Sequence, residues 1–212
     1  MRSPTIFLID DDPSFLTAAT RLLRAGHYSV QTFRSASEFL HNAPLDQPGC
    51  VLLDLQMPGL SGLELQEALI KTESPLPIIF LTGQGDIPSS VHAVKRGAED
   101  FLTKPVKKEV LFAAVERALA RDARERKQRA RRFELRSRFE KLTPRERDVL
   151  KQVARGQLNK QIATDLGTSE RTIKAHRANI MAKLQAQSVA ELVTMVQEAE
   201  FGKDSNDVIS NR

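Results

Sequence analysis

The feature that most constrains the fold is a short apolar run that ends in one carboxylate and is followed by a turn. Residues 51–53 (Val-Leu-Leu) precede Asp54, and Pro58-Gly59 follows closely. A run without polar residues is typical of a strand buried on both faces of a sheet, and Pro-Gly ends such a strand. Asp54 is therefore expected at the carboxyl end of a central strand, facing a crevice. The competing interpretation is an ordinary turn or helix-capping aspartate.

Strand and helix patterns alternate along the first part of the chain. The expected strands are residues 5–9, 28–33, the strand ending at Asp54, 77–82 and 100–103. A helix is expected after each strand, and the one between the fourth and fifth strands is placed at about residues 88–96. This alternation predicts an α/β fold in which helices cover both faces of a parallel sheet.

Polar side chains gather where those strands end. In parallel α/β sheets, ligands bind outside the carboxyl ends of the strands, so these side chains share one edge. They are Asp10, Asp11, Asp54, Thr82 and Lys104. Each of them alone is explained by a helix cap or a solvated charge, but their convergence on one edge is improbable by chance. The sequence therefore predicts a site at this edge.

The chemistry of these side chains indicates phosphoryl transfer. Clustered carboxylates need a cation, and hard oxygen ligands with few protein contacts suit Mg²⁺. Asp54 would attack phosphorus, Lys104 would neutralise the phosphoryl oxygens together with the metal, and Thr82 would donate a hydrogen bond. The alternative is a Ca²⁺ or Mg²⁺ site without transfer. Lys104 argues against it, because an ammonium group opposes the binding of a metal ion.

Composition and charge narrow the class of protein. The single cysteine, Cys50, excludes a disulfide framework and is expected to be a small buried side chain. We find no leader-like segment and no apolar run long enough for a bilayer, so we expect a cytoplasmic protein without a membrane partner.

The net charge of +5 is unevenly distributed. Residues 1–120 carry 11 Lys and Arg against 14 Asp and Glu, residues 121–141 carry 10 against 4, and residues 142–187 carry 9 against 4. An acidic front half and a basic back half indicate two domains, the second facing an anion such as nucleic acid.

Residues 121–141 connect the two halves. This stretch lacks Gly and Pro, is rich in good helix formers and places some opposite charges four residues apart. Apolar residues return at Phe133, Leu135 and Phe139. We expect a long, mostly polar helix that continues from the preceding one, with a short coiled coil near Phe133 as an option. The alternative is a flexible basic arm that contacts DNA phosphates.

The basic back half has the pattern of a small helical bundle. Residues 142–146 (Leu-Thr-Pro-Arg-Glu) form a capping box, and further helices are expected over residues 159–166 and 172–184 and from residue 188. Gly167 separates the second helix from the basic third one, which predicts a helix-turn-helix whose third helix suits a DNA major groove. The alternative is a helical bundle with a solvated basic face.

Residues 5–120 resemble the receiver domain of two-component response regulators. The segments that carry this resemblance are Asp10-Asp11, Asp54 with Met57-Pro58-Gly59 and Gly62, Thr82-Gly83, and Lys104-Pro105. The resemblance implies a flavodoxin-like (βα)5 fold with strand order 2-1-3-4-5. It also implies that a partner histidine kinase phosphorylates Asp54.

The same resemblance assigns roles at the strand ends. It implies that Asp11, Asp54 and the backbone carbonyl of Gln56 hold Mg²⁺ directly, with Asp10 acting through water. It makes Thr82 and Phe101 a switch pair, in which the hydroxyl turns toward the phosphoryl group and the ring moves inward. Position 101 carries Phe rather than Tyr, so this ring has no hydroxyl to bond.

Residues 140–198 resemble the LuxR/FixJ-type output domain. Three segments carry this resemblance: residues 142–146, residues 159–163 (Asn-Lys-Gln-Ile-Ala) and residues 172–176 (Thr-Ile-Lys-Ala-His). It implies that early residues of the third helix face DNA bases, with Ala178 offering only a methyl group. The expected DNA-contacting residues are Lys160, Thr172, Lys174, Ala175, His176, Arg177, Ala178, Asn179 and Lys183.

The predicted protein is thus a DNA-binding response regulator of the FixJ/NarL family, which accepts a phosphoryl group but is not an enzyme with steady turnover. The expected domains are a receiver over residues 1–120, a charged helical linker over 121–141, a helix-turn-helix domain over 142–200 and a flexible tail over 201–212. The expected partners are a cognate histidine kinase, a double-stranded DNA operator, a second copy of the chain after phosphorylation, and RNA polymerase.

Three other functions stay open at this stage. The first is an aspartyl phosphatase, although Ser14 stands where those enzymes have Thr or Val. The second is a constitutive DNA binder whose receiver is no longer phosphorylated. The complete set of polar residues at the strand ends argues against this function. The third is a regulator that binds a small molecule. A cluster of acidic metal-binding residues is a poor pocket for an apolar ligand.

Overall fold

The computed structural model describes residues 3–72, 76–83 and 96–207. The chain divides into two compact units, Met1–Arg126 and Lys127–Arg212. The helix expected at about residues 88–96 lies outside the described residues. In the described part of the chain, no helix is long and apolar enough to cross a membrane.

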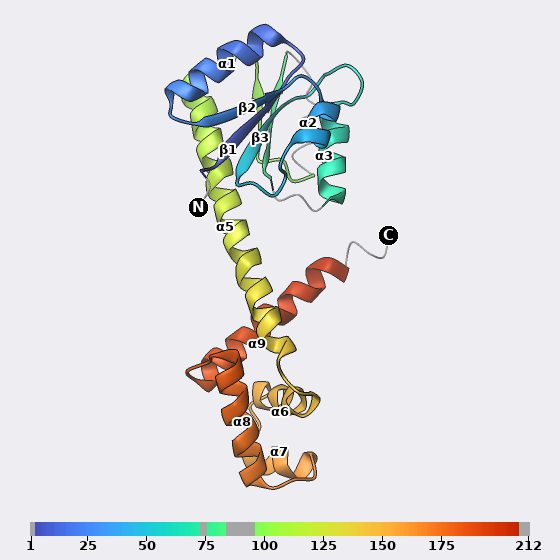
Figure 1. The fold of residues 1–212 in the computed structure, drawn as a ribbon, viewed down its shortest axis with the longest axis vertical. Helices are drawn as coiled ribbons and strands as arrows, with labels where there is room; N and C mark the ends of the chain where they lie inside the picture. Colours follow the sequence, from blue (N-terminus) through green and yellow to red (C-terminus); the bar gives the residue numbers. More distant parts are fainter. Residues whose placement is uncertain (1–2, 73–75, 84–95, 208–212) are drawn as a thin grey trace. The chain divides into compact units, whose positions relative to one another are not determined.

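The first unit is built on a five-stranded parallel sheet (Figure 1). Its strands are β1 (Thr5–Ile9), β2 (Ser29–Phe33), β3 (Gly49–Asp54), β4 (Ile78–Thr82) and β5 (Asp100–Thr103). They lie in the order β2-β1-β3-β4-β5, and each neighbouring pair is parallel. The predicted fold class and strand order are confirmed, and the topological switch point lies between β1 and β3.

Helices cover both faces of this sheet. The helices of the first unit are α1 (Pro13–Ala25), α2 (Ala36–Asn42), α3 (Gly62–Lys71) and the N-terminal part of α5 (Lys108–Glu140). α1 and α5 pack on one face, and α2 and α3 pack on the other (Figure 1). Cys50 is fully buried in the core beneath α1 and α5, as the sequence predicted.

The strand that ends at Asp54 has the burial that its sequence predicted. All six residues of β3 are buried, and β1 and β4 pair with it on either side. Gly62, at the start of α3, lies against the end of β3, where a Cβ would stand 2.4 Å from the carbonyl oxygen of Asp54. The capping box of Ser61 and Glu64 fixes this start of α3. The backbone around Asp54 is therefore closely packed.

The first unit extends to Arg126, beyond the limit of 120 expected from the sequence. The carboxylate of Asp122 is buried and accepts a hydrogen bond of 2.9 Å from the backbone N–H of Gly49. Arg126 pairs with Asp122 and donates to the carbonyl oxygens of Asp46 and Gln47. Part of the charged stretch of α5 thus belongs to the packing of the first unit.

The second unit is a helical bundle. Its helices are the C-terminal part of α5, α6 (Pro144–Ala154), α7 (Asn159–Asp165), α8 (Glu170–Leu184) and α9 (Val189–Asp207). One apolar core joins them, and it includes Leu135 of α5, which is fully buried. α5 is helical without a break through residues 121–140. α9 continues to Asp207, through residues 201–207 that the sequence assigned to a flexible tail.

The close contact between Gly62 and Asp54 gives a testable prediction for stability. We expect Gly62→Ala to lower the free energy of unfolding of the first unit by about 1–3 kcal/mol, because the new methyl group overlaps a backbone oxygen. The measurement is denaturant unfolding followed by tyrosine fluorescence. Because the chain has one tyrosine, Tyr28, and no tryptophan, this signal reports on the first unit.

The matched control is Gly83→Ala, where no atom of the described residues lies within 4 Å of the added Cβ. That change is expected to stay within about 0.5 kcal/mol of the wild type. Equal losses in the two variants would contradict the importance of the Gly62 contact.

Candidate functional site

Three carboxylates meet at the carboxyl edge of the sheet. Asp10 and Asp11 follow β1, Asp54 ends β3, and one oxygen atom of each lies within 4.8 Å of the others. Asp10 is 1% exposed and Asp54 is 7% exposed, whereas Asp11 is open to solvent. This donor set fits a hard divalent cation that keeps several waters, which is the preference of Mg²⁺. The convergence predicted from the strand ends is therefore present in the fold.

Lys104 brings the only opposite charge that contacts these carboxylates among the described residues. Its Nζ lies 2.5 Å from Asp10 Oδ2 and 3.0 Å from Asp54 Oδ1. It also lies 4.2 Å from the centroid of the Phe15 ring, a cation–π distance. Sequence reasoning missed Phe15, because an apolar residue in the first turn of α1 is ordinarily read as core.

The charges at this edge are incompletely balanced. Burial raises the pKa of Asp54 above its ordinary value, and the neighbouring Asp10 and Asp11 charges add to this effect, although Lys104 acts in the opposite direction. Burial disfavours the charged form of Lys104, but its hydrogen bonds to Asp10 and Asp54 outweigh burial and raise the pKa of Lys104. One ammonium thus contacts two buried carboxylates.

The other residues predicted for this site lie at the same edge. Thr82 ends β4 and is 4% exposed, one residue beyond the partner of Asp54 in the β3–β4 register. The backbone N–H of Lys104 donates to the carbonyl oxygen of Thr82 at 2.6 Å, which joins the ends of β4 and β5. Gln56 follows β3 and its side chain is exposed.

Phe101, the proposed partner of Thr82, lies on β5. It is paired in register with Phe80 of β4, and the two ring centroids are 6.1 Å apart. The ring is partly buried and packs against the core beneath α2 and α3. The role of Phe101 as a switch stays a prediction.

Most of the residues predicted to contact DNA lie on the surface of α8. Those that are exposed are Thr172, Lys174, Ala175, Ala178 and Asn179 on α8, and Lys160 on α7. His176 and Arg177 are partly buried, and Arg177 donates to Asn159 Oδ1 at 3.0 Å. Arg177 therefore ties α8 to α7, while Lys174 and Asn179 are open to solvent.

Lys183 has a different environment from the one that the sequence suggested. Its Nζ lies 2.7 Å from Glu146 Oε2, and Glu146 is 3% exposed. Glu146 also accepts from the backbone N–H of Thr143, and the bond to Lys183 is the largest of the effects that lower the pKa of Glu146. This ion pair joins α6 to α8, so Lys183 is better explained as part of the bundle than as a DNA contact. A local helical pattern could not reveal it, because the two residues are far apart in the sequence.

Comparison with known proteins gives matches to both units. Residues 6–116 match the response regulator receiver domain, and residues 140–196 match the bacterial regulatory proteins of the luxR family. The response regulator protein TodT of Pseudomonas putida is 43% identical, over 92% of this chain and 86% of its own length. The transcriptional regulatory protein FixJ of Bradyrhizobium diazoefficiens is 40% identical, over 94% of this chain and 97% of its own.

Solved structures are similar over nearly the whole length. The response regulator StyR gives a TM-score of 0.84 at 45% identity, covering 93% of this chain and 100% of that chain. Full-length FixJ from B. japonicum gives a TM-score of 0.58 at 38% identity, covering 95% and 99%.

The raised pKa of Asp54 gives a prediction for stability. The folded state binds the Asp54 proton more tightly than the unfolded chain, so the cost of charging Asp54 is fully present above the raised pKa and absent below the ordinary aspartate pKa. We expect Asp54→Asn to raise the free energy of unfolding of the first unit at pH 7 without Mg²⁺. The gain should shrink as the pH falls through the raised pKa of Asp54 and should vanish below the ordinary aspartate pKa, and denaturant unfolding at several pH values measures it.

The control for this prediction is Asp148→Asn, which removes an exposed carboxylate from α6 in the second unit. It is expected to leave the unfolding transition detected by Tyr28 unchanged. A less stable Asp54→Asn variant at pH 7 would mean that the contact with Lys104 outweighs burial and like-charge repulsion.

Proposed function

The chain belongs to the response regulators of two-component systems, with a receiver domain and a LuxR-type DNA-binding domain, and from this membership we propose that phosphorylation of Asp54 controls the binding of α8 to DNA. The observation that carries the proposal is the bridge of Lys104 between the buried carboxylates of Asp10 and Asp54. An ammonium held there lies beside the position that a phosphoryl group on Asp54 would occupy.

The proposed transfer needs a donor with a phosphorylated histidine. A carboxylate oxygen of Asp54 attacks phosphorus, and the new P–O bond forms as the P–N bond of the phosphohistidine breaks. The imidazole leaves with the bonding electron pair and takes up a proton from water. Lys104 offsets the charge of the phosphoryl oxygens, and Thr82 donates its hydroxyl hydrogen to one of them.

The carboxylate cluster is suited to a metal ion. When bound, Mg²⁺ supplies positive charge to the phosphoryl oxygens, and Asp11, Asp54 and the backbone carbonyl of Gln56 would hold it, with Asp10 acting through water. The residues themselves keep the acceptor oxygen close to Lys104 and limit the access of water to Asp54.

The proposed switch links this edge to the surface of the sheet. When the Thr82 hydroxyl turns toward the phosphoryl group, it leaves space that the ring of Phe101 fills. Because the ring is Phe, packing alone distinguishes its two positions, without a hydrogen bond in either state. The resulting change around β5 favours a dimer in this proposal, and two output domains then bind paired half-sites of an operator.

The other partners follow from this role. A histidine kinase delivers the phosphoryl group, and double-stranded DNA binds the exposed face of α8. RNA polymerase is the proposed machinery on which the bound dimer acts. We place these exchanges in the cytoplasm, where bacterial DNA lies, and we propose slow loss of the phosphoryl group rather than catalytic turnover.

The test of the acceptor role uses a small phosphoryl donor. With acetyl phosphate and Mg²⁺, the wild-type chain is expected to gain the mass of one phosphoryl group and to form more dimer. Asp54→Asn is expected to lose both effects, while Asp46→Asn, which changes a carboxylate away from this edge, keeps them. Intact-mass spectrometry and sedimentation measure the two readouts. An Asp54→Asn variant that still gains the mass and dimerises would overturn the assignment.

The contrasting environments of two lysines give a test of the DNA-facing helix. Lys174→Ala is expected to weaken binding to a DNA duplex selected from a random pool. It should also reduce, by about one, the slope of the logarithm of the binding constant against the logarithm of the salt concentration, because one phosphate contact is lost. Its effect on stability is expected to stay within about 0.5 kcal/mol, since the side chain is exposed.

Lys183→Met is the matched comparison. It leaves the buried carboxylate of Glu146 without its cation, which costs about 1–3 kcal/mol of stability in the second unit. Hydrogen exchange of the α6 amides should therefore be faster in Lys183→Met and unchanged in Lys174→Ala. If Lys183→Met instead leaves stability unchanged and reduces the salt slope, Lys183 is a DNA contact after all.

A further inference from the structure

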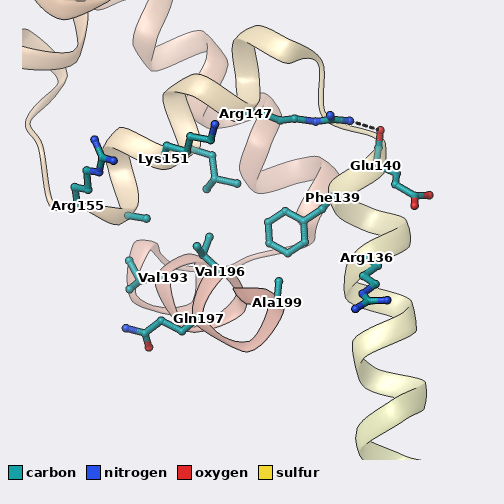
Figure 2. Close-up of a pocket in the computed structure, with 12 residues that line it drawn as sticks. Arg136, Phe139, Glu140, Arg147, Lys151, Arg155, Val193, Val196, Gln197 and Ala199 are labelled. Atoms are coloured by element: carbon teal, nitrogen blue, oxygen red, sulfur yellow. Dashed lines mark hydrogen bonds between the residues drawn. The ribbon is translucent and has the colours of Figure 1, made fainter. Parts of the chain in front are cut away.

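A groove runs across the second unit between α5, α6 and α9 (Figure 2). Its volume is about 880 Å³, within the range of pockets that hold ligands or partner side chains. The residues that line it are Arg136, Phe139 and Glu140 of α5, Arg147, Leu150, Lys151 and Ala154 of α6 with its C-cap residue Arg155, and Val193, Val196, Gln197 and Ala199 of α9.

The floor of the groove is apolar. The ring of Phe139 points into it, toward Val196, with Ala199 beside them (Figure 2). Phe139 and Val196 are only partly buried, although both pack against the core of the bundle. A continuous apolar strip on an exposed face is a feature of interaction surfaces rather than of an ordinary solvated helix.

One wall of the groove is a row of cations. Arg147 and Lys151 of α6 and Arg155, which caps the C-terminus of that helix, are spaced four residues apart, so they lie on one side of the helix over about 12 Å. All three side chains are exposed, and among the described residues none of the three has a carboxylate within ion-pair distance. Like charges at this spacing weaken a helix, so the row costs stability unless an anion binds it.

We propose that this groove binds an acidic, amphipathic α-helix of a partner protein. Apolar side chains of such a helix, spaced three and four residues apart, would cover Phe139 and Val196. Carboxylates on its flank, at the same four-residue spacing, would pair with Arg147, Lys151 and Arg155. The groove thus combines an apolar anchor site with a charge pattern of the same period as the proposed ligand.

Two other occupants fit less well. A second copy of the chain, placed face to face, would bring the two cation rows together, which is repulsive. DNA would satisfy the cations but would leave the apolar floor without a partner. The groove also shares no residue with the predicted DNA contacts on α7 and α8, so a partner helix can occupy it while α8 binds DNA.

The experiment uses the full chain and a designed helical peptide. The peptide carries Leu at helical spacing on one face and Glu at four-residue spacing on the adjacent flank, and a second peptide replaces each Glu with Lys. Fluorescence anisotropy measures binding to the wild type, to Lys151→Glu/Arg155→Glu, and to Arg132→Glu/Arg171→Glu. The last variant makes the same change in net charge at exposed cations outside the groove.

The expected result is that the acidic peptide binds the wild type at least ten-fold more tightly than the basic peptide. Lys151→Glu/Arg155→Glu should lose that affinity by ten-fold or more and gain affinity for the basic peptide, while Arg132→Glu/Arg171→Glu behaves as the wild type. Amide shifts in the presence of the acidic peptide should lie on α6 and α9. Circular dichroism checks that each variant is folded.

Three results would overturn the proposal. The first is equal loss of peptide binding in the two double variants, which would mean a non-specific charge effect. The second is self-association of the chain that Lys151→Glu/Arg155→Glu abolishes, which would assign the groove to a second copy. The third is displacement of the acidic peptide by duplex DNA with shifts on α6, which would assign the cation row to phosphates.

Discussion

The electrostatic balance around the ammonium of Lys104 is the constraint on which the first unit depends. Parallel strands force Asp10, Asp11 and Asp54 to one edge, since each follows or ends a strand of the same sheet. Opposite charges at such distances in a partly buried site interact strongly, and like charges repel equally strongly. One ammonium cannot balance three carboxylates, so the edge keeps an excess of negative charge that a divalent cation would offset. Burial is the largest cause of the raised pKa of Asp54, and the charges of Asp10 and Asp11 add to it although Lys104 acts in the opposite direction.

Two other buried carboxylates in the chain are balanced, and the comparison identifies the unusual one. Asp122 accepts from the Gly49 backbone and pairs with Arg126, and Glu146 accepts from the Thr143 backbone and pairs with Lys183. Each of these carboxylates has its own cation and a backbone N–H donor. Each therefore links two elements of the fold, and its negative charge is neutralised within the protein. The Asp54 carboxylate shares its cation with Asp10 and stands near a further negative charge. Incomplete neutralisation, rather than burial alone, distinguishes the Asp54 carboxylate from these two structural ion pairs.

The sequence predicted those features that depend on order along the chain. Strand order and the carboxyl-edge residues follow from alternation, because a parallel sheet brings the same end of every strand together. The residues that sequence reasoning missed all depend on contacts between distant segments. Phe15 lies over Lys104, Asp122 reaches the start of β3, and Glu146 meets Lys183 across the bundle. None of these pairs has a fixed spacing, and their side chains have equally good local explanations as core, linker or solvated surface. The ion pair of Lys183 with Glu146 is a contact of this kind, and a DNA contact of Lys183 stays a prediction.

The surface of α8 limits what a single output domain can read. Its exposed residues include Lys174 and Asn179, which can bond base edges or phosphates, but Ala175 and Ala178 between them offer only methyl groups. Each wrong base pair typically costs about 1–3 kcal/mol, so one short helix face gives limited discrimination between sequences. Two copies on paired half-sites double the number of bases read and add the phosphate contacts of both domains. In the proposed function, association of two copies therefore adds to selectivity, and it is the step that a charge on Asp54 is proposed to control.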